Sequence, residues 1–247
     1  MITNSLNNLL YLPLGGTAVG TCLNAEKNFD KKVISEINLE LKTKFKIQNK
    51  FHGLSFKDDL VYAHSTLKVL CTNLYKIAND IRFLSSGPRC GYNEIIIPNN
   101  EPGSSIMPGK INPTQCEALM MVCLQVFGND STISLANSQG NFQLNTFMPL
   151  IALNYVSSLQ LISDVLNSFS KLCLDGLKPN KTKMDDNVNN SLMLITALTS
   201  KIGYEKAAQV ANYANEKNLS LKQAALNLKI VNDEKEFDKL VNPSLMI

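Results

Sequence analysis

The sequence predicts an all-α fold: a bundle of long helices followed by a small helical domain at the C-terminal end. Apolar residues form an a/d seam over four heptads between residues 58 and 85, a spacing that keeps helices in contact along a left-handed supercoil. Residues 118–127 are apolar on nearly every side, as in a helix at the centre of a bundle. The sustained alternation of polar and apolar residues that indicates β-strands is absent, except near residues 93–98.

The first elements along the chain are two helices and one short strand. A short amphipathic helix is predicted for residues 30–45, and the seam helix for residues 58–85. The strand is predicted at residues 95–97, three consecutive isoleucines in a loop. The seam consists of two series, Leu60, Leu67, Leu74 and Ile81, and Ala63, Leu70, Ile77 and Leu84.

The rest of the chain is expected to be helical, first in long and then in short pieces. One helix is predicted from Gln115 to about Leu135. A second begins near Pro149, a residue that suits a first helical turn, and continues to Leu172. Three shorter helices follow, at residues 203–216, 220–228 and 233–241.

The change to short helices predicts a domain boundary near Asn189. The prediction is a bundle domain of residues 1–188 and a small helical domain of residues 189–247. Ser220 and Asn232 are expected to be N-caps in the small domain, because their side chains accept hydrogen bonds from the first turn of a helix.

Composition restricts the class of protein. The 247 residues are 45% hydrophobic, enough for one substantial core with a small satellite domain. A net charge of +3 does not predict nucleic-acid binding, and with Arg82 and Arg89 as the only arginines no cluster of phosphate-binding forks is expected. No apolar run approaches the roughly 20 residues that span a bilayer, so no membrane partner is expected.

Cysteines and histidines predict neither disulfides nor a metal centre. The six cysteines form no C-x-x-C pair, and we interpret them as reduced thiols in a cytosol-like compartment. His52 and His64 are the only histidines, too few for the usual His and Cys ligand sets, so no metal and no cofactor are expected. The first 26 residues lack Lys and Arg, unlike a presequence. A cytoplasmic location is expected, with the mitochondrial matrix as the alternative.

Residues 101–113 form a loop with a dense set of hydrogen-bonding groups. Three prolines and two glycines prevent a helix there. The segment is either an ordinary surface connection or a functional loop, and its length between two buried helices favours function. A phosphate-binding P-loop is excluded, because Gly103 and Gly109 are one residue too far apart and Ile111 replaces the required hydroxyl residue.

This loop and further motifs resemble those of a known family. Gly103 to Pro113 is similar to the signature loop of the fumarase and aspartase superfamily, and Thr114 to Ala118 is similar to its extension in class II fumarases, whereas aspartases usually differ there. The chain therefore resembles the C-terminal half of a class II fumarase. Further matches are Leu14 to Thr21, Asn49 to Phe51, Lys76 to Arg82, Ser86 to Arg89, Gly140 to Phe142 and Ser191 to Leu194.

The resemblance implies a hydro-lyase, which reversibly adds water to fumarate to give L-malate through a carbanion held as an aci-carboxylate. It implies Ser104 as the catalytic base, and Ser105, Lys110, Ile111 and Asn112 as substrate-binding residues. A serine hydroxyl is a poor base at neutral pH, so we expect nearby donors, backbone N–H groups among them, to stabilise the Ser104 oxyanion. Lys110 suits the charge that builds on the substrate carboxylate.

Glu117 has two interpretations. The resemblance implies a catalytic residue that orients a histidine involved in activating water. The residues alone predict a capping box, in which Thr114 is the N-cap and the Glu117 side chain bonds back to the Thr114 backbone N–H. Both roles stay open at this point.

The resemblance also implies a missing part. Family members are about twice as long, and the Thr-His motif and Ser-Ser-Asn loop of their N-terminal halves have no counterpart here, while His52 and His64 are expected to be structural. Because family active sites join segments from three subunits of a homotetramer, we expect the chain to be inactive alone and to work beside a chain that carries the N-terminal half. The alternatives are a non-catalytic remnant or structural subunit, and an aspartate ammonia-lyase of the same fold.

Overall fold

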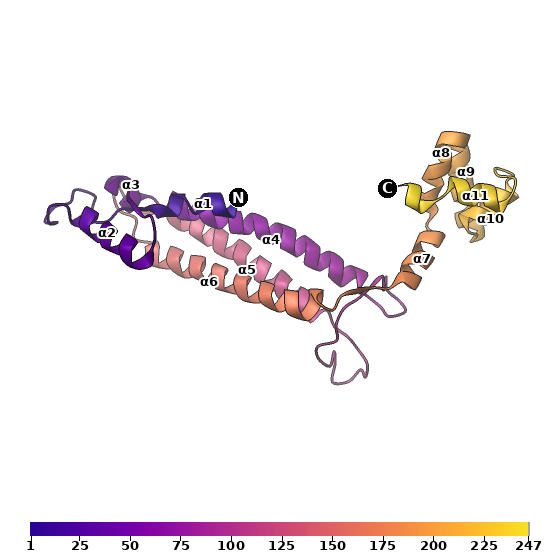
Figure 1. The fold of residues 1–247 in the computed structure, drawn as a ribbon, viewed down its shortest axis with the longest axis horizontal. Helices are drawn as coiled ribbons and strands as arrows, with labels where there is room; N and C mark the ends of the chain where they lie inside the picture. Colours follow the sequence, from indigo (N-terminus) through magenta and orange to yellow (C-terminus); the bar gives the residue numbers. More distant parts are fainter. Residues whose placement is uncertain (247) are drawn as a thin grey trace. The chain divides into compact units, whose positions relative to one another are not determined.

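The computed structural model describes residues 1–246 and confirms the all-α prediction (Figure 1). Contacts divide the chain into two compact units. Unit 1 comprises Met1–Phe83 and Ile97–Leu177, and unit 2 comprises Leu84–Ile96 and the chain from Lys178 onward. The predicted boundary between residues 188 and 189 lies within unit 2, and it stays a prediction.

Unit 1 is built on three long helices that run side by side in Figure 1: α4 (Asp58–Leu84), α5 (Thr114–Asn137) and α6 (Met148–Phe169). The helix predicted to continue to Leu172 changes to a π-helical turn at Ser170–Leu174. The two-residue strands β1 (Tyr11–Leu12) and β2 (Lys46–Ile47) pair in parallel, which the sequence did not indicate. The shorter elements of unit 1 are α1 (Ile2–Ser5), the 3₁₀ turn Asn8–Leu10, β1 (Tyr11–Leu12), α2 (Phe29–Leu41), β2 (Lys46–Ile47) and α3 (Lys50–Ser55).

The core of unit 1 lies between the three long helices. From the predicted α4 seam, Leu67 is buried there and Leu70, Leu74 and Ile81 pack against it. Ile77 departs from the prediction, with 46% of its surface exposed. The buried members of this core are Leu67, Cys71 and Ala78 of α4, Cys116, Leu119, Cys123 and Val126 of α5, and Ile162, Val165, Phe169 and Cys173 of α6 and its π-helical turn.

The amphipathic helix α2 ends four residues before the predicted end at residue 45. Lys42 takes a left-handed backbone conformation with φ of 51°, which stops the helix. The Asn38 side chain then binds the backbone of Phe45 on both sides, donating to its carbonyl at 2.9 Å and accepting from its N–H at 2.6 Å.

Helices α5 and α6 carry many exposed apolar side chains. Met121 and Leu153 are 64% and 66% exposed. By length and composition alone, α5 and the α6 helix with its π-helical turn could each span a membrane, with a mean hydropathy of 1.2, although neither is an uninterrupted apolar run of about 20 residues. A core helix of a helical bundle meets the same criterion, and the charged Asp130 lies buried in the middle of α5.

Unit 2 joins a small sheet to a group of short helices. Strand β3 (Ile95–Ile96) pairs antiparallel with β4 (Lys178–Pro179), which confirms the short strand predicted at residues 95–97. The buried core of the short helices includes Leu198, Val210 and Phe237. The helices of unit 2 are α7 (Lys181–Asn190), the 3₁₀ turn Leu192–Ile195, α8 (Thr196–Ile202), α9 (Tyr204–Lys217), α10 (Leu221–Asn227), α11 (Glu234–Leu240) and the 3₁₀ turn Pro243–Leu245.

One of the two predicted N-caps is confirmed. Ser220 caps α10 in a complete capping box with Gln223. The prediction for Asn232 is wrong, because Asp233 caps α11 by accepting from the Glu236 backbone N–H at 2.8 Å. Asn232 instead donates its own backbone N–H to the Glu236 carboxylate at 2.8 Å.

Glu236 is expected to make the stability of unit 2 depend on pH. The hydrogen bond from the Asn232 backbone, followed by contact with Lys201, lowers the Glu236 pKa from 4.5 to about 2. The unfolded chain therefore takes up this proton first as pH falls, so the stabilisation is present above about 4.5 and is lost as pH falls toward 2. Denaturant titrations of Glu236→Gln across this range should show a weaker pH dependence, whereas the control Glu205→Gln should retain it.

Candidate functional site

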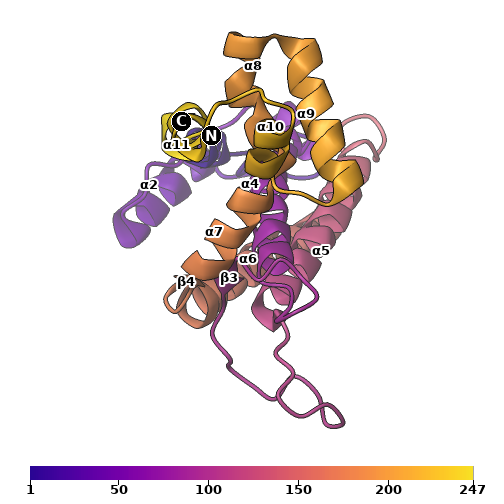
Figure 2. The ribbon, with the colours of Figure 1, turned by 90° about the vertical axis from the view of Figure 1, so that its right-hand side faces the viewer.

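The loop at residues 97–113 extends away from the ends of the long helices before it enters α5 (Figure 2). Two hydrogen bonds close it into a hairpin: the Gly103 N–H donates to the Lys110 carbonyl at 3.0 Å, and the Asn112 amide donates to the Gly103 carbonyl at 2.5 Å. A Cβ atom on Gly103 would lie 2.2 Å from the Lys110 carbonyl oxygen. Only glycine therefore permits this closure.

Ser104 lies inside the hairpin and is half-buried. Its Oγ accepts hydrogen bonds from the backbone N–H groups of Ile106 and Met107, both at 3.2 Å. Two donors aimed at one hydroxyl oxygen favour its negatively charged form, because they stabilise the oxyanion more than the neutral hydroxyl. The backbone donors expected around Ser104 are thus present.

The other loop residues predicted for the site lie around the same hairpin. Ser105, Lys110 and Ile111 are exposed, so their side chains are accessible to a ligand, and Asn112 is half-buried at the base of the hairpin. The hairpin brings Asn112 close to Ser104 through the intervening Gly103. The loop therefore presents a hydroxyl, an ammonium and an amide within one short segment.

Glu117 lies in the first turn of α5, and its capping-box prediction is wrong. The helix begins at Thr114 after Pro113, and no side-chain bond caps it. The Glu117 backbone N–H donates to the Pro113 carbonyl at 3.0 Å. Its carboxylate pairs instead with the Arg82 guanidinium of α4, at 3.4 Å from Nε, and stays 42% exposed. Glu117 is thus free to face a further group while Arg82 contacts it.

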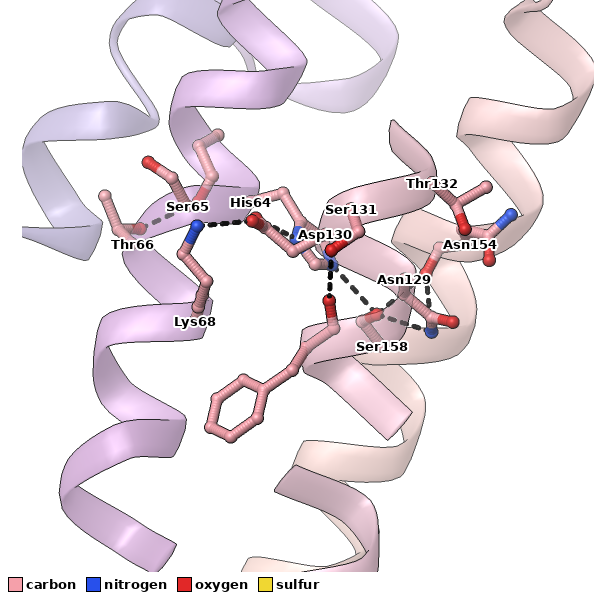
Figure 3. Close-up of polar contacts among 12 residues, drawn as sticks. His64, Ser65, Thr66, Lys68, Asn129, Asp130, Ser131, Thr132, Asn154 and Ser158 are labelled. Carbon is pink, nitrogen blue, oxygen red and sulfur yellow. Dashed lines mark hydrogen bonds and ion pairs between the residues drawn. The ribbon is translucent and has the colours of Figure 1, made fainter. Parts of the chain in front are cut away.

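His64 is part of a buried polar network between α4, α5 and α6 (Figure 3). Its Nδ1 lies 2.9 Å from Asp130 Oδ1 and its Nε2 lies 2.9 Å from Ser158 Oγ. Lys68 donates to the second Asp130 oxygen at 2.5 Å, and the Asn129 amide donates to Ser158 Oγ at 2.9 Å.

This network has the atom order of a Ser-His-Asp triad. Ser158 and His64 are both 0% exposed, however, so no substrate reaches the hydroxyl. The arrangement agrees with the structural role expected for His64. His52 lies 3.0 Å from Asp58 Oδ1 at the start of α4 and is also remote from the loop residues in sequence. Within residues 1–246, no group of three His, Cys, Asp or Glu side chains could hold a metal ion.

Comparison with models of protein families identifies the family of this chain. A family model described as Lyase matches residues 1–128, which is 128 of the 247 residues. The chain belongs to the lyase family. A second model, described as the Fumarase C C-terminus, matches residues 194–247. The lyase match includes the whole hairpin loop and the first turns of α5.

Several class II fumarate hydratases are similar to this member of the lyase family along its whole length. The one from Helicobacter pylori is 53% identical over 247 residues, an alignment that covers 100% of this chain and 53% of the relative. The one from Bacillus subtilis is 51% identical over 248 residues, covering 100% of this chain and 54% of the relative. The chain thus spans about half the length of the curated relatives it matches.

Solved structures give the same result for the lyase fold. The crystal structure of a class II fumarase from Schistosoma mansoni superposes with a TM-score of 0.90 at 40% identity, covering 98% of this chain and 54% of that one. A fumarate lyase:delta crystallin from Brucella melitensis, bound to cobalt, also has a TM-score of 0.90, at 34% identity, covering 99% of this chain and 53% of that one.

Two features of the long helices were not predicted from the sequence. The first is the Arg82–Glu117 ion pair, which joins two helices whose predicted ranges gave no register between them. The second is the polar network, whose signal was the Asn129-Asp130 pair inside an otherwise apolar helix. A buried carboxylate requires partners, and this rule would have directed attention to His64 and Lys68.

Proposed function

We propose that the chain is the C-terminal part of a fumarate hydratase, which catalyses the reversible hydration of fumarate to L-malate. The observation that carries this proposal is 53% identity along the entire chain to a class II fumarate hydratase. The hairpin loop supports it, because a serine hydroxyl with two backbone donors lies in the same segment as an exposed lysine.

In the proposed reaction, Ser104 acts as the base on malate. Its oxyanion, stabilised by the Ile106 and Met107 N–H groups, removes a proton from the carbon next to a carboxylate. The charge then spreads onto that carboxylate as an aci-carboxylate, where Lys110 stabilises it more than it stabilises the ground state. Ser105, Ile111 and Asn112 bind the substrate. The hydroxyl group on the neighbouring carbon then leaves as water, taking a proton from the histidine that activates water in the reverse direction, and this completes the elimination to fumarate.

Glu117 is proposed to orient the histidine involved in activating water. Neither histidine of this chain is available for that role, since His64 is buried and His52 pairs with Asp58. The proposal therefore places the histidine on a chain that carries the N-terminal half. The 42% exposure of Glu117 leaves room for such a contact.

The proposed partners are a small dicarboxylate, further copies of the chain in a homotetramer, and a complementing N-terminal-half chain. Exposed apolar patches of this kind usually mark protein interfaces, and such side chains line α5 and α6. Helices of the other subunits would cover these side chains, so we propose no membrane partner. We propose no nucleic-acid partner, because the net charge of +3 is small. The proposed location is the cytoplasm, with the mitochondrial matrix as the alternative.

Complementation tests this function. The chain would be co-expressed with the N-terminal half of the Helicobacter pylori relative, and fumarate hydration followed by ultraviolet absorbance, for the purified complex and for the chain alone. We expect turnover by the complex and none by the chain alone. Turnover by the lone chain would contradict the need for a second half, and a stable complex without turnover would favour a non-catalytic subunit. Release of ammonia from aspartate in place of malate turnover would favour the ammonia-lyase alternative.

A further inference from the structure

An ion pair joins the end of α4 to the start of α5, at the end of the bundle from which the hairpin loop extends (Figure 1). Arg82 lies in the last turn of α4 and Glu117 in the first turn of α5. A positive charge is favoured at the C-terminal end of a helix and a negative charge at its N-terminal end. Each residue therefore suits its own helix, and their closest contact is 3.4 Å, from Arg82 Nε to Glu117 Oε1.

The backbone that carries both side chains is fixed by the core of unit 1. Next to Arg82, Ile81 packs against this core, and next to Glu117, Cys116 is 0% exposed. The Glu117 side chain itself is 42% exposed, so packing restricts its torsions only in part. An unrestrained glutamate side chain samples many rotamers, and the contact with Arg82 favours those that bring the carboxylate to α4.

The Glu117 carboxylate can accept a second donor beside Arg82. A carboxylate has about four lone-pair sites on its two oxygens, and the closest approach of Arg82 is to one of them, Oε1. The exposed part of the carboxylate is accessible to a group from another chain. Arg82 therefore restricts where Glu117 points without occupying all of its acceptor sites.

We propose that Arg82 is a positioning residue for fumarate hydration, which holds the Glu117 carboxylate in the orientation that the water-activating histidine requires. This inference rests on the proposed function, in which Glu117 orients a histidine of the N-terminal half. The carboxylate accepts a hydrogen bond from one ring nitrogen, which fixes the tautomer and leaves the other nitrogen to face water. Arg82 contacts neither water nor substrate in this scheme, and it acts only through Glu117.

The ion pair is too exposed to act mainly on stability. Arg82 and Glu117 are 47% and 42% exposed, and ion pairs between exposed side chains contribute little to the free energy of unfolding. Orientation is more sensitive, because a displacement of about 1 Å at a reacting centre can lower a rate by roughly 10²-fold. Loss of Arg82 should therefore leave the fold intact and slow the reaction.

A double-mutant cycle in the complemented assembly tests the proposal. The chain with Arg82→Gln, Glu117→Gln or both would be co-expressed with the N-terminal half of the Helicobacter pylori relative, and kcat and KM for fumarate measured. We expect Arg82→Gln alone to lower kcat by roughly 10- to 100-fold and to leave KM nearly unchanged. In the Glu117→Gln background, the same change should lower kcat by less than about 2-fold further, because Arg82 then has no carboxylate to hold.

Further variants separate the charge from the fold. Arg82→Lys keeps a positive charge within reach of Glu117 and should retain more of kcat than Arg82→Gln. Lys222→Gln is the matched control: it removes the cation of an exposed ion pair of unit 2, between Lys222 and Asp238, and should leave kcat unchanged. Circular dichroism and inhibition by succinate should be the same for Arg82→Gln and the unsubstituted chain.

The outcomes distinguish this inference from the proposed function. If the unsubstituted assembly showed no turnover, the proposed function and the inference would fail together. Full kcat for Arg82→Gln in an active assembly, or equal losses for Arg82→Lys and Arg82→Gln, would overturn the inference alone. An equal loss of kcat with and without the Glu117 carboxylate, or a loss that follows unfolding, would show that Arg82 does not act through Glu117.

Discussion

Replacing Ser104 with alanine in the complemented assembly is expected to lower kcat for fumarate hydration by roughly 10²–10⁴-fold, the range that a positioned proton-transfer group contributes. The change removes the oxygen that the Ile106 and Met107 N–H groups stabilise, and leaves the backbone bond between Gly103 and Lys110 in place. Binding of succinate, a dicarboxylate that cannot react, should weaken much less than kcat falls. Steady-state kinetics and succinate inhibition measure the two effects.

The control for this substitution is Ser244→Ala, which changes an exposed serine of unit 2. It should leave kcat unchanged. If Ser104→Ala retained full activity in an assembly that needs the chain for turnover, Ser104 would not be the base and the role of the hairpin loop would be limited to binding. If the unsubstituted assembly were inactive as well, the non-catalytic alternative would explain both results.

The helices were predictable from the sequence because their pattern repeats over many residues. The four-heptad seam placed α4 within one residue of its observed ends, Asp58 and Leu84. Helix ends that depend on a single side chain were harder to predict. Thr114 has the residue type of an N-cap, yet the helix begins at Thr114 itself and Pro113 takes the cap position. The Glu117 carboxylate does not bond back to the Thr114 backbone, because it has a stronger partner in the charged Arg82.

The hairpin loop was predictable as a feature but not in its geometry. Prolines and glycines excluded a helix between residues 101 and 113, and the family resemblance indicated Ser104. The bond between the Gly103 N–H and the Lys110 carbonyl spans seven residues of irregular backbone, and no periodic pattern encodes such a bond.

The His64 network leads to the largest expected effect on stability, for the substitution Asp130→Ala. Asp130 is 4% exposed and accepts from both His64 and Lys68. Removing one partner of a buried hydrogen bond destabilises a protein by about 1–3 kcal/mol, and by more where that partner is charged, because the group left behind remains desolvated without a bond. Lys68 is 44% exposed and can bond to water instead. In this case His64, itself 0% exposed, cannot recover its lost bond from water. Urea denaturation followed by circular dichroism would measure the free energy of unfolding.

Asp80→Ala is the matched control, because Asp80 is 45% exposed and pairs along α4 with Lys76. An exposed pair of this spacing contributes about 0.3–0.5 kcal/mol. A loss below about 1 kcal/mol for Asp130→Ala would mean that water enters the network and that its bonds add little. Asp130→Asn separates charge from hydrogen bonding: its amide oxygen still accepts from one neighbour, so its loss should lie between those of the two alanine variants. That order would show that α4, α5 and α6 depend on this carboxylate for its two directed bonds and not merely for the volume it fills.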